Sequence, residues 1–196
     1  MRSLSLEESK KELANNRVGV MPTDTLYGLL GTAKSQEVVE RIYALKKRDS
    51  SKPLIILVSE WEHLRGFGVR SRDMANLDLE YFWPGKVSII LPCPGKDYEH
   101  LKRGGESLAF RYPAHKGLRS VIEETGPLVA PSANPEGDLP AKNTREAYDY
   151  FGEGVDFYVD EGELSSDPST LISIAEGKVT VEREGAVKIK ESRFFS

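Results

Sequence analysis

Two polar regions that lie far apart in the sequence hold the side chains best suited to chemistry. The first comprises Pro22-Thr23-Asp24-Thr25 and the later Lys46-Lys47-Arg48, and the second is Pro131-Ser132-Ala133-Asn134. Both proline-led segments follow short apolar runs, and ligands of α/β sheets gather at the carboxyl ends of strands. Lysine neutralises phosphate as a point charge and arginine as a planar fork, while hydroxyl and amide groups hydrogen-bond other ligand atoms. The residue types therefore indicate a nucleotide pocket with cations on one side and small polar groups on the other.

Each segment taken alone also has a simpler structural interpretation. Lys46 and Arg48 suit a solvated helix end, where cations favour the negative end of the dipole. The segments around Thr23 and Ser132 suit turns whose side chains satisfy nearby backbone amides. Arg111, at the end of an apolar run, is either a carboxylate receptor or a cation in solvent. Single motifs leave both interpretations open.

Several common catalytic patterns are absent from the sequence. The run Gly28-Leu29-Leu30-Gly31 lacks the GxGxxG spacing, Gly85-Lys86 lacks the rest of a P-loop, and there is no GxSxG elbow. The three histidines are far apart without metal-ligand spacing, so we expect no metal site made of protein side chains. Cys93 is the single cysteine and lies between two prolines, so we expect it to be inert packing and to form no internal disulfide.

The composition is that of an ordinary globular domain. The chain has 196 residues, 39% of them hydrophobic and 30% charged, with a formal net charge of −4. No apolar run approaches the length of a membrane span, and the charged N-terminus lacks a signal core, so we expect a cytoplasmic protein with no membrane partner. The acidic balance argues against nucleic acid as the main ligand, although a local basic cleft remains compatible with it.

Hydrophobic periodicity predicts alternating helices and strands in the first part of the chain and clustered strands in the last. This order predicts a single α/β (α+β) domain, a twisted mixed β-sheet flanked by helices. Loops are expected over 135–140 and 161–168, either as lids or as surface turns. The expected helices cover 4–15, 35–45, 71–82, 115–125 and 143–150. The expected strands cover 17–21, 54–58, 87–91, 107–112, 128–130, 155–159, 169–174, 179–182 and 187–189.

The order of the motifs resembles the YrdC-like family of L-threonylcarbamoyladenylate synthases. PTDT-x-YG is followed by K-x-R, K-P-L-I, W-P-G, an R-x-P strand end, SAN, P-S-T and R-x-G-A, over roughly residues 17–187. The resemblance implies a YrdC-like domain over residues 1–196 with a concave face, the short form of the family. It also implies that threonylcarbamoyl-AMP and pyrophosphate are made from L-threonine, bicarbonate and ATP, for modification of the adenosine next to the tRNA anticodon.

The resemblance also implies roles for individual residues. It implies no catalytic side chain in the strict sense, because positioning and charge neutralisation by the binding residues would suffice. Mg²⁺ would arrive with ATP, and tRNA or downstream threonylcarbamoyl-transfer proteins would be further partners. The implied ATP-binding residues are Lys46, Arg48, Ser107, Ser132, Asn134 and Arg183. The implied L-threonine-binding residues are Thr23, Arg111, Ala130 (through its backbone) and Ser169.

Four residues depart from the family pattern. Asp49 stands where many members have proline, and Leu57 where many have a histidine near the threonine site. Glu136 and Asp138 place two acids beside the SAN motif, where they would oppose phosphate if they faced it. One alternative function is an RNA-binding YrdC-like module without synthase activity. Another is a carbamoyl-transfer domain of the hydrogenase-maturation type, which the absence of acylphosphatase-like and zinc-finger segments disfavours.

Overall fold

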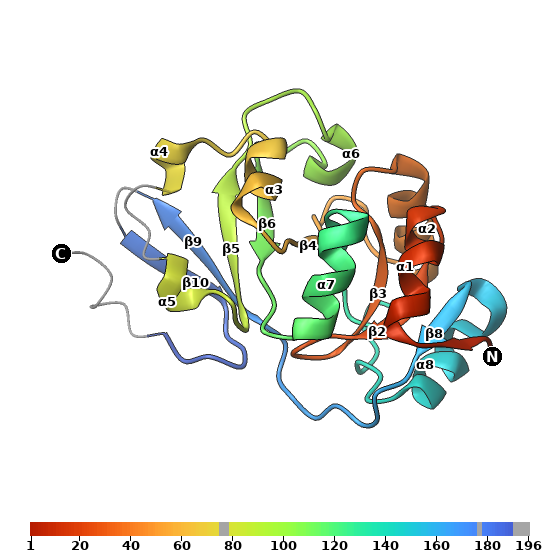
Figure 1. Cartoon of the computed structure of the whole chain (residues 1–196). Helices are drawn as coiled ribbons and strands as arrows, with labels where there is room; N and C mark the ends of the chain where they lie inside the picture. Colours follow the sequence, from red (N-terminus) through yellow and green to blue (C-terminus); the bar gives the residue numbers. More distant parts are fainter. Residues whose placement is uncertain (75–78, 176–177, 190–196) are drawn as a thin grey trace.

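A ten-stranded mixed sheet runs through the computed structural model, which describes residues 1–74, 79–175 and 178–189 (Figure 1). The strand order is β1-β8-β2-β3-β7-β4-β6-β5-β9-β10, so β1 and β10 form the two edges. Neighbouring strands are often far apart in sequence, as the chain returns several times to the middle of the sheet. The strands are β1 (Ser3–Leu4), β2 (Gly19–Pro22), β3 (Tyr27–Thr32), β4 (Ile55–Leu57), β5 (Val87–Pro92), β6 (Ser107–Arg111), β7 (Leu128–Val129), β8 (Phe157–Val159), β9 (Thr170–Ala175) and β10 (Lys178–Arg183).

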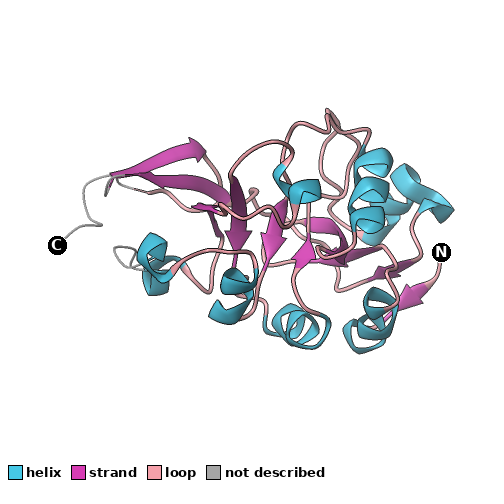
Figure 2. Cartoon of the chain, turned by 90° about the horizontal axis from the view of Figure 1, so that it is seen from above, coloured by secondary structure: helices cyan, strands magenta, loops and turns pink. Residues whose placement is uncertain are grey.

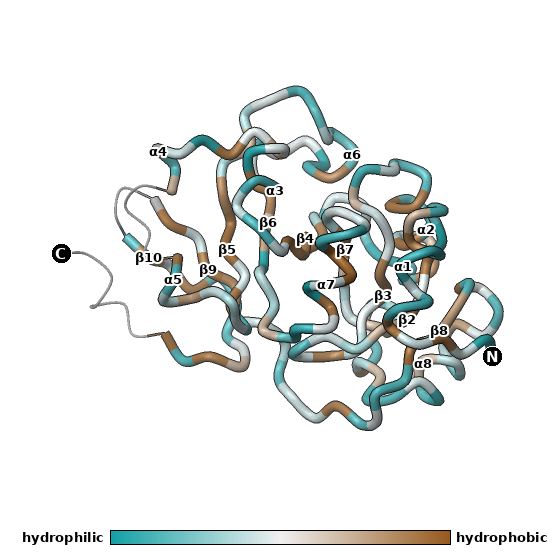
Figure 3. Tube along the Cα trace, viewed as in Figure 1, coloured by the Kyte–Doolittle hydropathy of each residue, from teal (hydrophilic) through white to brown (hydrophobic). Residues whose placement is uncertain are grey.

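Helices lie on both sides of this sheet. Helices α1 and α7 lie side by side on one side, and α2 and α8 lie on the other (Figure 2). Each pair covers its own cluster of buried apolar side chains, and the central strands form the most hydrophobic part of the trace (Figure 3). The helices are α1 (Leu6–Ala14), α2 (Gln36–Lys46), α3 (Trp61–Gly66), α4 (Ser71–Met74), α5 (Leu79–Phe82), α6 (Glu99–Lys102), α7 (Lys116–Thr125) and α8 (Thr144–Phe151), with a 3-10 turn η1 (Gly152–Gly154).

Side-chain caps set the first residues of the longer helices. Ser5 caps α1 in a capping box with Glu8, which is why α1 begins at Leu6 and not at the expected residue 4. Ser35 and Asn143 accept the amides of Val38 and Glu146 and so begin α2 and α8, as the sequence predicts. These local signals fix where the helices start, and packing against the sheet fixes where they lie.

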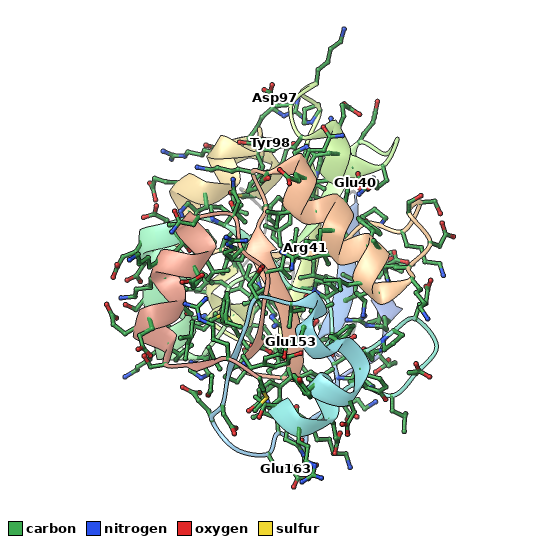
Figure 4. All side chains as sticks on the ribbon, turned by 90° about the vertical axis from the view of Figure 1, so that its right-hand side faces the viewer. Glu40, Arg41, Asp97, Tyr98, Glu153 and Glu163 are labelled. Atoms are coloured by element: carbon green, nitrogen blue, oxygen red, sulfur yellow. The ribbon has the colours of Figure 1, made fainter. Side chains whose placement is uncertain are left out.

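Helix α2 carries the Lys46-x-Arg48 motif at its end, and contacts along its length hold it in place. Glu40 and Arg41 of α2 and Glu153 of η1 lie on the face of the molecule that Figure 4 shows. The Arg41 guanidinium donates to Asp156 Oδ2 at 2.5 Å and to the Gly154 carbonyl at 2.7 Å. Because Asp156 also accepts the Val18 amide beside β2, this network ties α2 to the sheet.

The mixed sheet flanked by helices confirms the expected fold class, and most predicted elements are present. Strand β3 was not predicted, because Gly28 and Gly31 lower its strand propensity. A Cβ on Gly31 would lie 2.4 Å from Val38 Cγ1, so close packing of α2 on β3 requires glycine there. The strand predicted at 187–189 is wrong, because that segment is irregular and Val187 exchanges hydrogen bonds with the Thr170 hydroxyl and, among the described residues, not with the backbone of a neighbouring strand. The helix predicted at 71–82 appears as α4 and α5, and its residues 75–78 lie outside the described residues.

A Gly19→Ala substitution tests the packing between β2 and β8. A Cβ on Gly19 would lie 2.2 Å from Cζ of Phe157, whose side chain is fully buried. We expect overpacking to lower the free energy of unfolding by about 1–3 kcal/mol, measured by urea denaturation. Gly66→Ala is the matched control, because no atom lies within 4 Å of its Cβ position. The control should be neutral or stabilise by up to about 1 kcal/mol, and equal losses in both variants would contradict this account.

Candidate functional site

A cavity of about 260 Å³ opens where the two motif regions meet. The turn after β2, the end of α2, strands β4 and β6, the segment after β7 and the β9–β10 hairpin all contribute side chains to it. All of the site residues expected from the sequence line it except Asn134. Those lining residues are Thr23, Lys46, Arg48, Ser107, Arg111, Ala130, Ser132, Ser169 and Arg183.

Thr23 organises the turn between β2 and β3. Its hydroxyl accepts the amides of Thr25 and Leu26 at 3.1 and 3.2 Å and donates to the Leu26 carbonyl at 2.7 Å. The hydroxyl is therefore already used in a local turn, as the simpler interpretation of this motif expects. Thr25, which was not among the expected site residues, places its hydroxyl 3.1 Å from that of Thr23 and also lines the cavity.

Arg111, at the end of β6, is 4% exposed and lies against this turn. Its guanidinium donates to the Thr25 hydroxyl at 3.0 Å and lies 3.4 Å from Asp24 Oδ1, while Asp24 Oδ2 accepts the Ala114 amide. Burial lowers the pKa of Arg111, and the Asp24 carboxylate opposes that shift. Arg111 Nε is buried and has no hydrogen-bond partner among the described residues.

Lys46 joins the two motif regions through its ammonium group. Its Nζ donates to the carbonyls of Ser132 and Asn134, both at 2.6 Å, and the side chain is 2% exposed. An ammonium has three donors, so one remains after these two bonds. Burial, with the neighbouring Arg48 cation, lowers the pKa of Lys46 to about 8. Lys46 is thus both an anchor for the segment after β7 and a charge at the cavity wall.

Asn134, expected from the family resemblance to bind ATP, is not among the residues that line the cavity. Its Nδ2 donates to the carbonyls of Pro135 and Asp138 at 2.8 and 2.9 Å, so the amide holds the following loop closed. Its Oδ1 is buried without a partner. The residue reaches the site only through its backbone, where its carbonyl accepts from Lys46.

The rest of the segment after β7 is held by its backbone against β3. The Leu29 amide donates to the Pro131 carbonyl at 2.9 Å, and the Ala133 amide donates to the Tyr27 carbonyl at 2.8 Å. Ala130 donates its amide to the Ile55 carbonyl, so the Ala130 carbonyl is the backbone group that remains for a ligand. These bonds place Ser132 beside the end of α2.

Arg48 and Arg183 reach the cavity from different elements, the loop after α2 and strand β10. Arg48 donates to the carbonyls of Lys52 and Pro53 at 3.3 and 3.4 Å. Arg183 donates to the carbonyl of Ser169 at 2.7 Å and to its hydroxyl at 3.2 Å, and that hydroxyl also contacts Ser88. Burial and then the charge of Arg48 lower the pKa of Arg183, so the two guanidinium groups repel each other. No acidic residue is among the described residues that line the cavity, so its cations favour an anionic ligand.

Three strands form an apolar floor beside these cations. Ala109 pairs with Ile55 on one side and Ile90 on the other, so the three side chains form a row across β4, β6 and β5. Ser107 lies at the start of the same strand and contributes a hydroxyl. Sequence reasoning did not single out this row, because its residues are ordinary strand residues until the register brings them together.

Two residues that depart from the family pattern lie away from the ligand-facing wall. Leu57 is fully buried in the apolar cluster under α7 and does not line the cavity. Asp49 accepts the amide and hydroxyl of Ser51 at 2.9 and 2.8 Å, which orders the loop after α2 without a proline.

The described residues contain no group of three His, Cys, Asp or Glu side chains placed to hold a metal ion. Within the same part of the chain, no helix is both long and apolar enough to cross a membrane.

Comparison with known proteins identifies the family. The family model Sua5_yciO_yrdC, described as "Telomere recombination", matches residues 11–185. The chain therefore belongs to this family. Over 89% of its length it is 34% identical to the threonylcarbamoyl-AMP synthase of Bacillus subtilis, of which it covers 51%. It is 31% identical to the putative threonylcarbamoyl-AMP synthase of Methanocaldococcus jannaschii, over 97% of this chain and 90% of that protein.

Solved structures of relatives share the fold. The crystal structure of Pyrococcus abyssi Sua5 complexed with L-threonine superposes with a TM-score of 0.81 at 26% identity, over 94% of this chain and 56% of that one. The chain thus spans just over half the length of the Bacillus and Pyrococcus proteins.

The lowered pKa of Lys46 predicts how stability changes with pH. The unfolded chain binds a proton at Lys46 up to about pH 10.5, whereas the folded protein releases it near pH 8. Between about pH 8 and pH 10.5, the free energy of unfolding of the wild type should therefore rise by about 2–4 kcal/mol relative to that of Lys46→Met. Urea denaturation across this pH range measures the difference. A Lys46→Met curve that stays parallel to that of the wild type would refute the assignment.

Proposed function

We propose that the chain is a threonylcarbamoyl-AMP synthase, which joins L-threonine, bicarbonate and ATP and releases pyrophosphate. One observation carries the proposal: Lys46, Arg48 and Arg183 line a cavity without acidic lining residues, and the buried Arg111 lines the same cavity. The names of the bacterial and archaeal relatives support the same activity.

ATP would occupy the side of the cavity formed by the end of α2, the segment after β7 and β10. Lys46 and Arg48 would neutralise the phosphates, and Arg183 of β10 would add a third positive charge. The hydroxyls of Ser132 and Ser107 would donate to phosphate or ribose oxygens. Asn134 would act only by holding the loop after Ser132. The lining offers no carboxylate for a metal ion, so Mg²⁺ would be held by phosphate oxygens and water and would add charge neutralisation.

L-threonine would bind on the Arg111 side. Thr25 and Asp24 hold the Arg111 guanidinium in place, so it would be a preoriented receptor for a carboxylate. Thr23, Ser169 and the Ala130 carbonyl lie around it and would receive the hydroxyl and amino groups of the substrate. The relative whose structure holds L-threonine supports an amino-acid site in this fold.

The reaction then needs positioning and charge more than a protein nucleophile. The threonine nitrogen forms a bond to the bicarbonate carbon and a water molecule is lost, which gives a carbamate. A carbamate oxygen forms a bond to the α-phosphorus of ATP while the bond to the pyrophosphate oxygen breaks. Lys46, Arg48 and Arg183 would stabilise the charge that develops on pyrophosphate. The mixed anhydride formed would be used to modify tRNA, with tRNA or a downstream transfer protein as the next partner.

Substrate dependence tests this function. Pyrophosphate release should require ATP, Mg²⁺, bicarbonate and L-threonine together, because the carbamate is the nucleophile. A coupled pyrophosphate assay with each component omitted in turn measures it. Equal release without L-threonine would leave a simple ATPase, and no release at all with intact RNA binding would favour an RNA-binding module.

Substitutions on the two walls should give different defects. Arg48→Ala should weaken ATP binding, measured by calorimetry without L-threonine, by about 10- to 150-fold because a charged hydrogen bond is lost. Arg111→Lys should raise the apparent L-threonine constant by a similar factor and leave ATP binding unchanged. Lysine is chosen because it keeps a positive charge beside Asp24. Alanine at position 111 would leave the Asp24 carboxylate buried and unpaired. Thermal melts check folding, and an Arg111→Lys protein that loses ATP binding would show that the two walls are reversed.

A further inference from the structure

Glu136 joins the two loops that carry the cationic wall of the cavity. Its amide donates to the Lys46 carbonyl at 2.7 Å, at the last turn of α2. Its carboxylate accepts the Asp49 amide and the Lys52 ammonium, both at 2.8 Å. One residue of the segment after β7 thus contacts the chain on both sides of Arg48. We call these three contacts the Glu136 bridge.

Arg48 depends on such support because its own segment is irregular. Helix α2 ends at Lys46, and Lys47 has a left-handed backbone with φ of 50°. Within the part of the chain that the structure describes, the Arg48 side chain makes two long hydrogen bonds, to the carbonyls of Lys52 and Pro53. The Glu136 bridge fixes the residue two before Arg48 and the residue after it, so it sets the direction in which the guanidinium leaves the backbone.

The carboxylate of Glu136 does not line the cavity and does not compete with a ligand for the free donors there. Instead, Lys52 and the Asp49 amide hold the pKa of Glu136 below its usual range, so the group is an anion at neutral pH. This acid beside the SAN motif therefore contacts the loop after α2 and acts on a phosphate in the cavity only through space.

We propose that Glu136 is a positioning residue, which orients Arg48 toward the phosphates of a nucleotide by tying the loop after α2 to the segment after β7. This role rests on the proposed function, because it assumes that Arg48 binds phosphate.

Two effects of removing Glu136 have opposite signs, which makes the role testable. As a nearby anion, Glu136 opposes phosphate binding through space, so its neutralisation alone would tighten ATP binding. As a positioning residue, its removal frees Arg48 and weakens ATP binding. The sign of the change therefore separates positioning from a simple field effect.

The experiment measures ATP binding by calorimetry, without L-threonine, for Glu136→Ala, Glu136→Gln and Asp138→Asn. Glu136→Ala should weaken binding by about 3- to 10-fold, the range for one or two modest hydrogen bonds. Glu136→Gln keeps an oxygen for the Asp49 amide and should lose about half as much on a logarithmic scale. Asp138→Asn is the matched control, an exposed acid in the same loop whose carboxylate makes no hydrogen bond among the described residues, and it should not weaken binding.

The L-threonine constant should not change in either Glu136 variant, because a general loss of structure would affect both substrates. Amide hydrogen exchange at Asp49, followed by NMR, provides a readout without a ligand and should become faster in Glu136→Ala. Unchanged or tighter ATP binding in Glu136→Ala, or unchanged exchange at Asp49, would overturn the proposal. A wild-type protein that does not bind ATP would instead overturn the proposed function, and the exchange at Asp49 would still decide whether the Glu136 bridge orders the loop.

Discussion

The bond between the Lys46 ammonium and the carbonyls of Ser132 and Asn134 is the contact on which the rest of the site depends. It closes a separation of 86 residues in the sequence and joins the end of α2 to the segment after β7. A buried ammonium without acceptors would be strongly unfavourable. The lysine can therefore be buried here because the two carbonyls accept its hydrogen bonds. Because both segments also lie on β3, this contact fixes the distance between the two sides of the cavity.

The other cations of the site follow the same rule. Arg48 and Arg183 are held mainly by backbone carbonyls and hydroxyls, and among the described residues Arg111 alone of these three has a carboxylate partner, Asp24. Neutral acceptors satisfy the donors of a cation without cancelling its charge. The cavity therefore keeps a net positive charge in a partly desolvated place, where an anion is bound more strongly than at an open surface. This charge is consistent with a family whose relatives are named as synthases of an adenylate.

The residues that depart from the family pattern show how the fold tolerates change around a fixed site. Asp49 replaces a rigid proline with a side-chain turn, Leu57 belongs to the core under α7, and Glu136 binds the neighbouring loop. None of these three side chains lines the cavity. The effect of a polar residue on ligand binding therefore cannot be read from its distance in sequence to a motif. The orientation of its side chain decides whether it faces the ligand or a neighbouring loop.

The sequence by itself determined the fold class, most of the helices and strands, and the residue types of the cavity, because apolar periodicity, helix caps and motif order are local properties. It did not reveal β3, since its glycines weaken strand propensity and only the packing of α2 explains them. The tertiary structure alone decided that Asn134 turns away from the cavity, that Thr25 contacts Arg111, and that Ile55, Ala109 and Ile90 form one row. The physical reason is that side-chain direction and partner depend on strand register and on hydrogen bonds between distant segments, which no single stretch of sequence contains.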